Sequence, residues 1–252
     1  MNFFDWIWKI ISEYYPLFLK GIGNTMLIAI IGTVAGFGIG LLVAIIRTVP
    51  EGKNKVGNFF MKIVKFVLVA YIEVFRGTPM MIQAAVIYYG IVRGRMDLTV
   101  AALIIVSINT GAYMAEIIRG GIISVDVGQT EGAMSLGMTH WQTMVHVVLP
   151  QAIRNIMPSV GNEFVVNIKD TSVLNVIGVS ELYFQAKSAA GTYYKFFESF
   201  VIAAVIYFIL TFVTTRILKL LEKKMEGKKN YTIFGSQSDF KSTIHLTEDK
   251  AR

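Results

Sequence analysis

The feature that most constrains this chain is an uninterrupted apolar stretch, from Gly21 to Ile46, in which no side chain is charged. A helix needs about 20 mostly apolar residues to cross the hydrocarbon core of a bilayer, and this stretch is longer. Two further stretches, Leu98 to Ala115 and Ser199 to Thr215, are nearly as apolar. Three such stretches in one chain predict a protein embedded in a membrane.

Composition supports this prediction and excludes several kinds of site. Charged residues make up 16% of the 252-residue chain, whereas a soluble domain is closer to about 25% charged. There is no cysteine, so disulfides and thiolate metal sites are excluded. The net charge of +7 fits cationic loops on the cytoplasmic side of a membrane, and we expect contacts with lipid and none with nucleic acid.

Two more regions, around 59–92 and 151–179, are apolar but interrupted by charges. With them, the sequence predicts an all-α membrane protein with about five transmembrane helices. We expect these near residues 17–46, 62–92, 98–121, 151–179 and 197–221. Residues 1–16 are aromatic and amphipathic, which predicts a helix lying in the membrane interface, and residues 222–252 predict a polar cytoplasmic tail.

Lys and Arg are unevenly distributed between the two sets of span ends. Arg47, Lys53, Arg119 and Lys223 are among those on the richer side. Because cytoplasmic loops carry the excess of positive charge, we expect the N-terminus outside and the C-terminus inside. The loop at about 124–150 is then cytoplasmic.

This loop is too polar to span a bilayer, and its residues predict two short helices with a corner between them. Gly137 can end the first helix by adopting a positive φ, and Thr139 with Gln142 has the spacing of a capping box for the second. Pro150 is expected to push Leu149 out of the helical region and to allow a kink into the next span. The second helix is amphipathic, with one apolar face formed by Trp141, Met144, Val145, Val148 and Leu149. From the residues alone, the segment is either a surface helix resting on lipid or a docking element.

The loop resembles the EAA loop of the membrane subunits of ABC importers, E-A-A-x3-G-x9-I-x-L-P. The matching positions are Glu131, Gly132, Ala133, Gly137, Val147, Leu149 and Pro150. Two positions depart from the pattern, because Gly132 stands where alanine is usual and Val147 where isoleucine is usual. Both changes in volume are small.

Four stretches resemble a narrower group, the histidine/glutamine/arginine permease family of polar amino-acid importers. They are Glu73–Gln83, Asn109–Ile122, Gly128–Met138 and Lys169–Leu182, and the resemblance covers about residues 17–221. It implies a multi-pass permease subunit in a bacterial cytoplasmic membrane, which passes a polar amino acid inward by alternating access. It also implies three protein partners: a separate ATPase that receives the loop as a coupling helix, a second permease subunit and an extracellular substrate-binding protein. Trp141 joins the matching positions as an expected coupling residue.

The sequence agrees that the motor lies in another chain. It contains no G-x-x-x-x-G-K-[ST] phosphate loop, so we expect ATP and magnesium to bind the partner ATPase and no cofactor to bind here. His140 and His146 are six residues apart and do not share a helix face, so no metal site is expected. We therefore do not expect this chain to be an enzyme.

Polar residues inside the predicted spans are candidates for a substrate pathway, because a charge at mid-membrane costs about 2.5–3.5 kcal/mol on insertion scales. Two sets have helical i, i+4, i+7 spacing, one in the third predicted span and one in the fourth. With Gln83, the candidates are Asn109, Tyr113, Glu116, Glu163, Asn167 and Asp170. The alternatives are contacts between helices and, for Asp170, a cap at a helix break.

The second predicted span contains Glu73, Arg76 and Pro79. Glu73 and Arg76 are three residues apart, so they either form a local ion pair or lie at the pathway and dimer region that the resemblance implies. Pro79 removes a backbone hydrogen bond and predicts a kink or a broken helix. Carboxylates outnumber cations in the spans, which favours a zwitterionic or cationic substrate. Another small solute on the same architecture, or a stand-alone channel, remains an alternative.

Overall fold

The computed structural model describes residues 2–49 and 55–225, and this part of the chain contains helices and no strand. The first half consists of α1 (Phe3–Thr48), α2 (Lys55–Gly77), α3 (Met80–Ala85), the π-helix η1 (Val86–Ile91) and α4 (Leu98–Ile123). The middle holds α5 (Val127–Ser135), α6 (His140–Thr143) and the π-helix η2 (Met144–Val148). The second half consists of α7 (Leu149–Asp170), the 3-10 helix η3 (Thr171–Ile177), α8 (Leu182–Tyr193) and α9 (Phe196–Met225).

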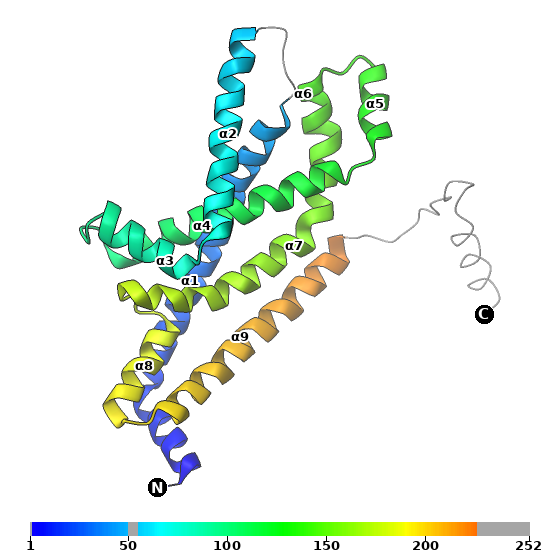
Figure 1. The fold of residues 1–252 in the computed structure, drawn as a ribbon. Coiled ribbons are helices and arrows are strands. Elements are labelled where there is room, and N and C mark those ends of the chain that lie inside the picture. Colours follow the sequence, from blue (N-terminus) through cyan, green and yellow to red (C-terminus); the bar gives the residue numbers. More distant parts are fainter. Residues whose placement is uncertain (1, 50–54, 226–252) are drawn as a thin grey trace, which may run out of the picture.

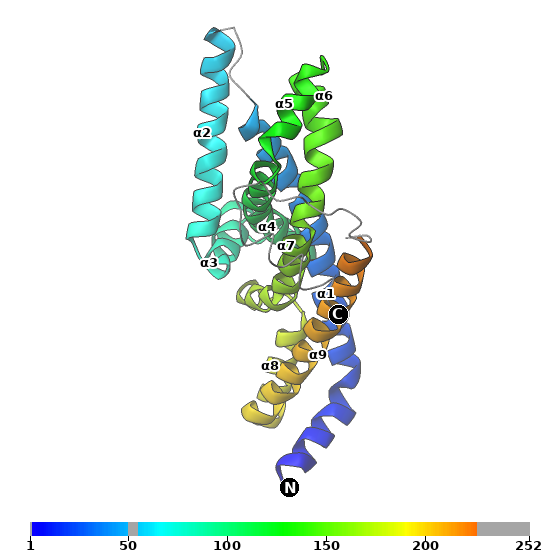
Figure 2. The same cartoon turned by 90° about the vertical axis from the view of Figure 1, so that its right-hand side faces the viewer.

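The molecule is elongated, with α1 running along most of its length (Figure 1). The N-terminus and α8 lie at one end, and α5, α6 and the start of α2 lie at the other (Figures 1 and 2). Within the described residues, three helices are long and apolar enough to cross a membrane, at Phe3–Thr48, Leu98–Ile123 and Phe196–Lys224. The prediction of an all-helical membrane protein is therefore confirmed.

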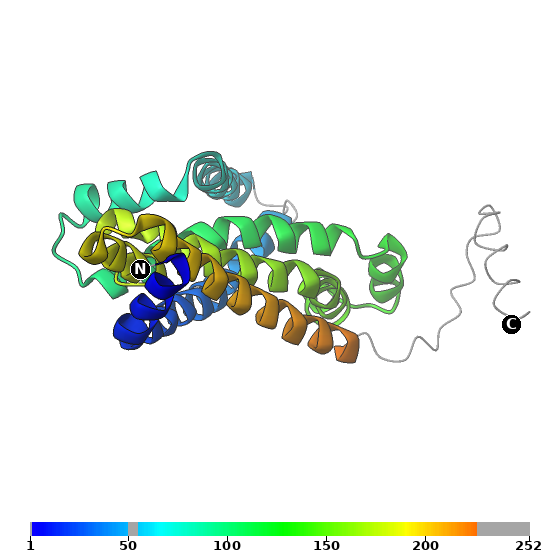
Figure 3. The same cartoon turned by 90° about the horizontal axis from the view of Figure 1, so that it is seen from below.

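Helices α1 and α4 pack with their backbones in contact. A Cβ atom added to Gly32 would lie 2.4 Å from Val106, one added to Gly36 would lie 2.7 Å from Thr110, and one added to Gly40 would lie 2.5 Å from Met114. Glycines four residues apart leave a groove along α1 that admits the side chains of α4. This contact lies at the centre of the bundle. In Figure 3, α4 (green), α7 (yellow-green) and α9 (orange) lie side by side in that order.

The predicted boundary at residue 16 between an interfacial helix and the first span does not appear as a break. Helix α1 continues through Pro16, although proline removes one hydrogen bond from a helix interior. Ile10 and Phe18, on either side of Pro16, are both buried in one apolar core with Leu182 and Ala186 of α8. Packing against α8 therefore holds the segments on both sides of Pro16 in one core.

The predicted break at Pro79 is confirmed. Helix α2 ends at Gly77, and Pro79 precedes α3 with an extended backbone, at φ −64° and ψ 134°. The fourth predicted span also changes geometry, because α7 gives way to η3 after Asp170. The Asp170 side chain makes no capping hydrogen bond there, so the alternative that it caps a helix break is wrong.

Helix α8 lies between the fourth and fifth predicted spans and has no counterpart among the predicted elements. Glu181 begins it, because its carboxylate accepts hydrogen bonds from the backbone N–H groups of Tyr183 and Phe184 at 2.9 and 2.8 Å. The same carboxylate accepts from the hydroxyl of Tyr207 in α9 at 2.7 Å. An acidic cap followed by Leu-Tyr-Phe was the available sequence signal for this helix.

The predicted kink at Leu149 and Pro150 is wrong. Leu149 has helical dihedral angles, φ −59° and ψ −43°, and η2 runs directly into α7. In a regular α-helix a proline ring clashes with the carbonyl group four residues earlier. The wider π-helical turn of η2 displaces that carbonyl, so Pro150 is accommodated without an interruption of the helix.

At the C-terminus, residues 222–225 belong to α9, and the rest of the predicted tail lies outside the described residues.

Candidate functional site

The loop between α4 and α7 forms a projecting pair of helices, which we call the hairpin (residues 124–148; Figure 2). Asp126 caps α5 by accepting a hydrogen bond from the N–H of Gly128 at 2.7 Å. Gly137 adopts the predicted positive φ, at +84°, and Thr139 with Gln142 forms the predicted capping box at the start of α6. The corner that the sequence predicts is therefore present.

The hairpin exposes apolar side chains together with the residues of the motif. Leu136 is 86% exposed, Trp141 is 59% exposed, and Glu131 and Gly132 are also exposed. Ala133 is buried beneath them. Trp141 does not cover the hairpin's own core, so a rigid, partly apolar surface is left for another molecule.

At its base the hairpin is joined to both neighbouring helices. Val125, Met144, Val148 and Ala152 form one apolar cluster, which ties α4, η2 and α7 together. The Asn155 amide of α7 donates to the hydroxyl of Ser124 at 3.2 Å. The base of the hairpin is therefore packed against the bundle on both sides.

A cavity of about 310 Å³ opens between the end of α4 and the two helices of the hairpin. Apolar side chains dominate its lining, and Thr130, His140 and Thr143 contribute the polar groups. The Thr143 hydroxyl is buried and has no hydrogen-bond partner among the described residues. Sequence reasoning did not single out Thr143, because a threonine in an amphipathic helix has no distinctive spacing.

Three of the predicted pathway residues form what we call the buried amide layer: Gln83, Asn109 and Asn167. The Asn109 amide donates to the carbonyl oxygen of Gln83 at 2.8 Å, which links α4 to α3. Gln83 in turn donates to the main-chain oxygens of Phe75 and Thr78, at 2.8 and 2.9 Å. Gln83 therefore binds carbonyl groups at the end of α2, beside the break at Pro79.

Asn167 joins three helices. Its amide donates to the hydroxyl of Thr33 in α1 at 2.8 Å, and its oxygen accepts from the hydroxyl of Thr110 in α4 at 3.1 Å. All three side chains are buried. Thr33 and Thr110 were not among the predicted site residues, although Thr33 lies next to a glycine of the α1 groove. The amide layer is thus a set of contacts between helices.

The other predicted residues of the fourth span lie differently. Glu163 and Asp170 on α7 are half-buried, and neither forms a hydrogen bond or an ion pair with a residue that the structure describes. The charges of Asp170 and Arg76 both act on Glu163. Arg76 of α2 lies over the ring of Tyr113 in α4, at 5.5 Å from its centroid. We call these four residues, Arg76, Tyr113, Glu163 and Asp170, the charged face.

The local ion pair between Glu73 and Arg76 is not formed within the described residues, and Glu73 is exposed. Arg76 points to Tyr113 instead, so the residues around Pro79 contribute one cation to the charged face. That cation comes from α2, whereas both carboxylates come from α7.

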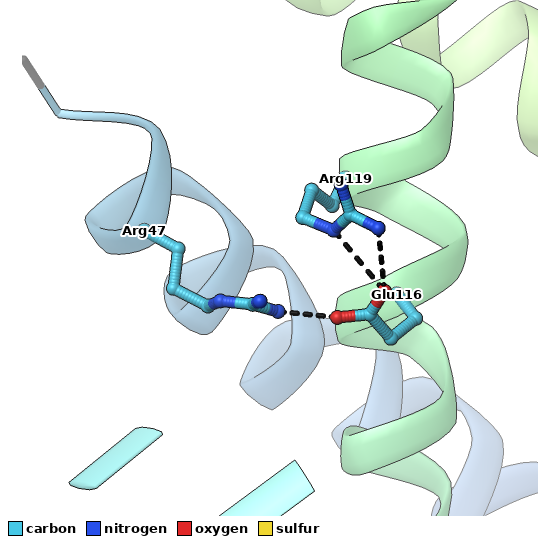
Figure 4. A network of polar contacts seen from close by, with 3 residues as sticks. All are labelled: Arg47, Glu116 and Arg119. Carbon is cyan, nitrogen blue, oxygen red and sulfur yellow. Dashed lines mark hydrogen bonds and ion pairs between the residues drawn. The ribbon is translucent and has the colours of Figure 1, made fainter. Parts of the chain in front are cut away.

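Glu116 does not join the charged face. Both of its carboxylate oxygens accept hydrogen bonds from arginines (Figure 4). One oxygen accepts from Arg47 of α1, and the other accepts two hydrogen bonds from Arg119, at 3.1 and 2.8 Å. It shares a helix with Asn109 and Tyr113, but its side chain is directed to the end of α1. The i, i+4, i+7 spacing therefore grouped residues with three different sets of partners.

The chain matches one family over most of its length, residues 55–227, and that family is described as "binding-protein-dependent transport system inner membrane component". The glutamine transport system permease protein GlnP of Escherichia coli (strain K12) is 37% identical over 229 residues, which are 88% of this chain and 98% of that protein. The arginine transport system permease protein ArtQ of Bacillus subtilis (strain 168) is 32% identical over 217 residues, 84% of this chain and 94% of that protein.

The fold also matches a solved structure, described as the crystal structure of an amino acid ABC transporter with histidines. The TM-score is 0.76 at 37% sequence identity, and the match covers 89% of this chain and 99% of that one.

Proposed function

Since the chain belongs to the family of inner membrane components of binding-protein-dependent transport systems, we propose that it is the permease subunit through which an amino-acid ABC importer moves its substrate. It is an integral membrane protein of the inner membrane and a permease. The observation that carries the proposal is the hairpin, whose corner at Gly137 and exposed apolar surface suit a docking element.

ATP hydrolysis takes place in a separate ATPase subunit, which receives the hairpin. The exposed residues Glu131, Gly132, Leu136 and Trp141 meet the ATPase, while the buried Ala133 supports them from below. Leu149 and Pro150 lie where η2 passes into α7. A movement of the hairpin is therefore delivered directly to the helix that carries Glu163 and Asp170.

The substrate is a polar amino acid, and its α-amino group meets the charged face. Two half-buried carboxylates without an ion-pair partner in the described part of the chain supply the negative charge that such a group needs. Named relatives include a glutamine and an arginine transport permease, so both a neutral and a cationic side chain occur among proteins similar to this one.

The remaining partners follow from the family. A binding protein delivers the amino acid at the outer face, and a second permease subunit, either another copy of this chain or a relative, completes the pathway. The chain crosses the membrane several times, with the hairpin in the cytoplasm.

Reconstitution tests the proposal directly. The permease is purified with its co-expressed ATPase and placed in vesicles with the binding protein, and uptake of labelled arginine, histidine, glutamine and cystine is measured with and without ATP. We expect ATP-dependent uptake of at least one. Uptake of none of them, or solute flux through the permease without an ATPase, would contradict the proposal.

The absence of native cysteine allows a direct test of orientation. Gly94→Cys should react with an impermeant maleimide on intact cells, because it lies opposite the hairpin in the predicted topology. Gly128→Cys in the hairpin should react only after the membrane is opened. The reverse pattern would place the hairpin outside and exclude its docking to a cytoplasmic ATPase.

A further inference from the structure

Glu116 lies at the centre of a network that the proposed pathway does not use. Arg119 donates through Nε and one terminal nitrogen to the same carboxylate oxygen, and Arg47 donates to the other (Figure 4). The side chains of Arg47 and Glu116 are only 18% and 21% exposed, and that of Arg119 is 37% exposed. Water screens such a network less than it screens an exposed ion pair, so its attraction between helices is larger.

The network closes the hairpin end of the α1–α4 contact. Gly32, Gly36 and Gly40 hold the two backbones together along the second half of α1 and the middle of α4. Val43 and Ala44 remain buried beyond the last of these glycines. Arg47 then occupies the last turn of α1, where the glycine groove has ended and a side chain must reach across to α4.

Beyond Glu116, α4 leads into the hairpin without an intervening loop. A Cβ atom at Gly121 would lie 2.2 Å from the side chain of Ile156, so α4 and α7 are in close contact at this level. The two residues that matter next are Ser124, which accepts a hydrogen bond from Asn155 of α7, and Asp126, which caps the start of α5. The network is therefore about two helical turns from the base of the hairpin.

The first half of α1 is attached to the start of α8 and to the residues just before it. A Cβ atom at Gly21 would lie 2.9 Å from the backbone of Leu182, and Asn24 donates to the carbonyl oxygen of Ser180 at 2.6 Å. Thr25 accepts from the N–H of Leu182 at 3.3 Å. Helix α1 thus connects the hairpin end of the molecule with the segment that follows Asp170 and η3.

We propose that Glu116 is a positioning residue for coupling: through Arg47 it fastens the end of α1 to α4, while Arg119 on α4 holds its carboxylate in place, so that both helices follow the hairpin as one body. Without it, the hairpin would move α4 and α7 while α1 and the α8 contact lagged behind. The inference rests on the proposed function, in which the hairpin receives the movement of an ATPase.

The competing account is that the network only neutralises charges, so that its loss lowers the stability of the protein. The ratio of ATP hydrolysed to amino acid transported separates the two accounts. In vesicles containing the complete transporter, Glu116→Gln should lower uptake about two- to thirtyfold more than it lowers ATP hydrolysis, the range expected when one element of a coupling network is removed. A loss of stability alone would lower both rates together and leave the ratio unchanged, which would overturn the proposal.

A charge exchange and a matched control sharpen this measurement. Arg47→Glu combined with Glu116→Arg keeps an ion pair between α1 and α4 with its charges reversed, so it should restore part of the wild-type ratio. Arg216→Gln removes a cation from α9 whose guanidinium lies over Phe212 and has no ion-pair partner in the described residues, and it should leave the ratio unchanged. A failure of the exchange to restore the ratio would contradict the proposal.

A distance measurement tests the same inference without transport. Because the chain has no native cysteine, spin labels attach only to the two introduced cysteines, Thr48→Cys on α1 and Gly120→Cys on α4, which lie next to the network. The distribution of distances between the labels should be narrow in the parent and clearly broader after Glu116→Gln. An unchanged distribution would overturn the proposal. If the unsubstituted transporter showed no uptake, that would count against the proposed function, but the effect of Glu116→Gln on the distance distribution would still be valid.

Discussion

The buried amide layer and the charged face lie in the same bundle, and both consist of residues that are unusual inside a membrane. In the amide layer every side chain is buried and hydrogen-bonded to another helix or to the end of α2. In the charged face both carboxylates are half-buried and lack such bonds within the described residues. A polar group without a partner in the bundle is costly there, and this cost supports the proposal that the substrate is the partner of the charged face. The difference separates residues that hold helices together from residues that we propose to meet a substrate.

The largest effect is expected from Asn167→Leu. It removes the acceptor of the Thr110 hydroxyl and the donor to Thr33, which leaves a buried polar group unpaired. We expect the free energy of unfolding to fall by about 2–4 kcal/mol, since a buried hydroxyl left unpaired at Thr110 costs about 1–3 kcal/mol and the lost bond to Thr33 about 1 kcal/mol more. Thermal unfolding in detergent measures this. Asn162→Leu, at an exposed position of the same helix, is the control and should change little.

The second largest effect is expected from Gln83→Met, which should lower the free energy of unfolding by about 1–3 kcal/mol. Methionine fills a similar volume but cannot donate to Phe75 and Thr78 or accept from Asn109. The same unfolding assay measures the change. If stability were unaffected and uptake alone were lost, Gln83 would belong with the charged face and the comparison would fail at this residue.

Glu163→Gln should lower uptake and leave the stability of the protein nearly unchanged, which is the opposite of the two amide substitutions. It keeps the shape of the side chain and deletes one charge, so uptake of a cationic amino acid should fall about tenfold or more, equivalent to about 1.4 kcal/mol. The free energy of unfolding should stay within about 0.5 kcal/mol of the parent, as for most substitutions outside a packed core. Uptake across arginine, lysine and glutamine, normalised to folded protein, checks the prediction. Unchanged uptake of all three would remove Glu163 from the site.

The smallest effect is expected from Tyr113→Leu, which removes the ring beneath the guanidinium group of Arg76. An interaction of this kind is worth about 0.5–1 kcal/mol when partly exposed, so uptake should change by about two- to fivefold. Arg76→Lys keeps the charge and gives the matched comparison. A loss of uptake as large as that of Glu163→Gln would mean that Tyr113 contacts the substrate itself.

Several elements of the fold and site could be predicted from local sequence. Uncharged stretches of 17 to 26 residues predict α1, α4 and α9, because an apolar helix of this length is about as long as the hydrocarbon core of a bilayer is thick. The corner at Gly137 and the capping box at Thr139 were predicted because both depend on neighbouring residues alone. The break at Pro79 agrees with the missing N–H of proline, and Gln83 binds the carbonyl groups at the end of α2 beside it.

Pro16 and Pro150 mark where local sequence was insufficient. Both lie within continuous helix, one beside the α8 core and the other after a π-helical turn. Proline lowers the stability of a helix by a definite amount, but distant packing decides whether the helix breaks.

The sequence by itself determined three of the helices predicted to span the membrane, α1, α4 and α9, the hairpin with its corner and the identity of every polar residue in the bundle. Only the tertiary structure decided which of those residues are partners. Glu116 and Tyr113 share one helix and helical spacing, yet one is held by Arg47 and Arg119 and the other lies beneath Arg76. Helical periodicity specifies a direction from one axis, whereas the partner found in that direction depends on where three or four other helices cross it.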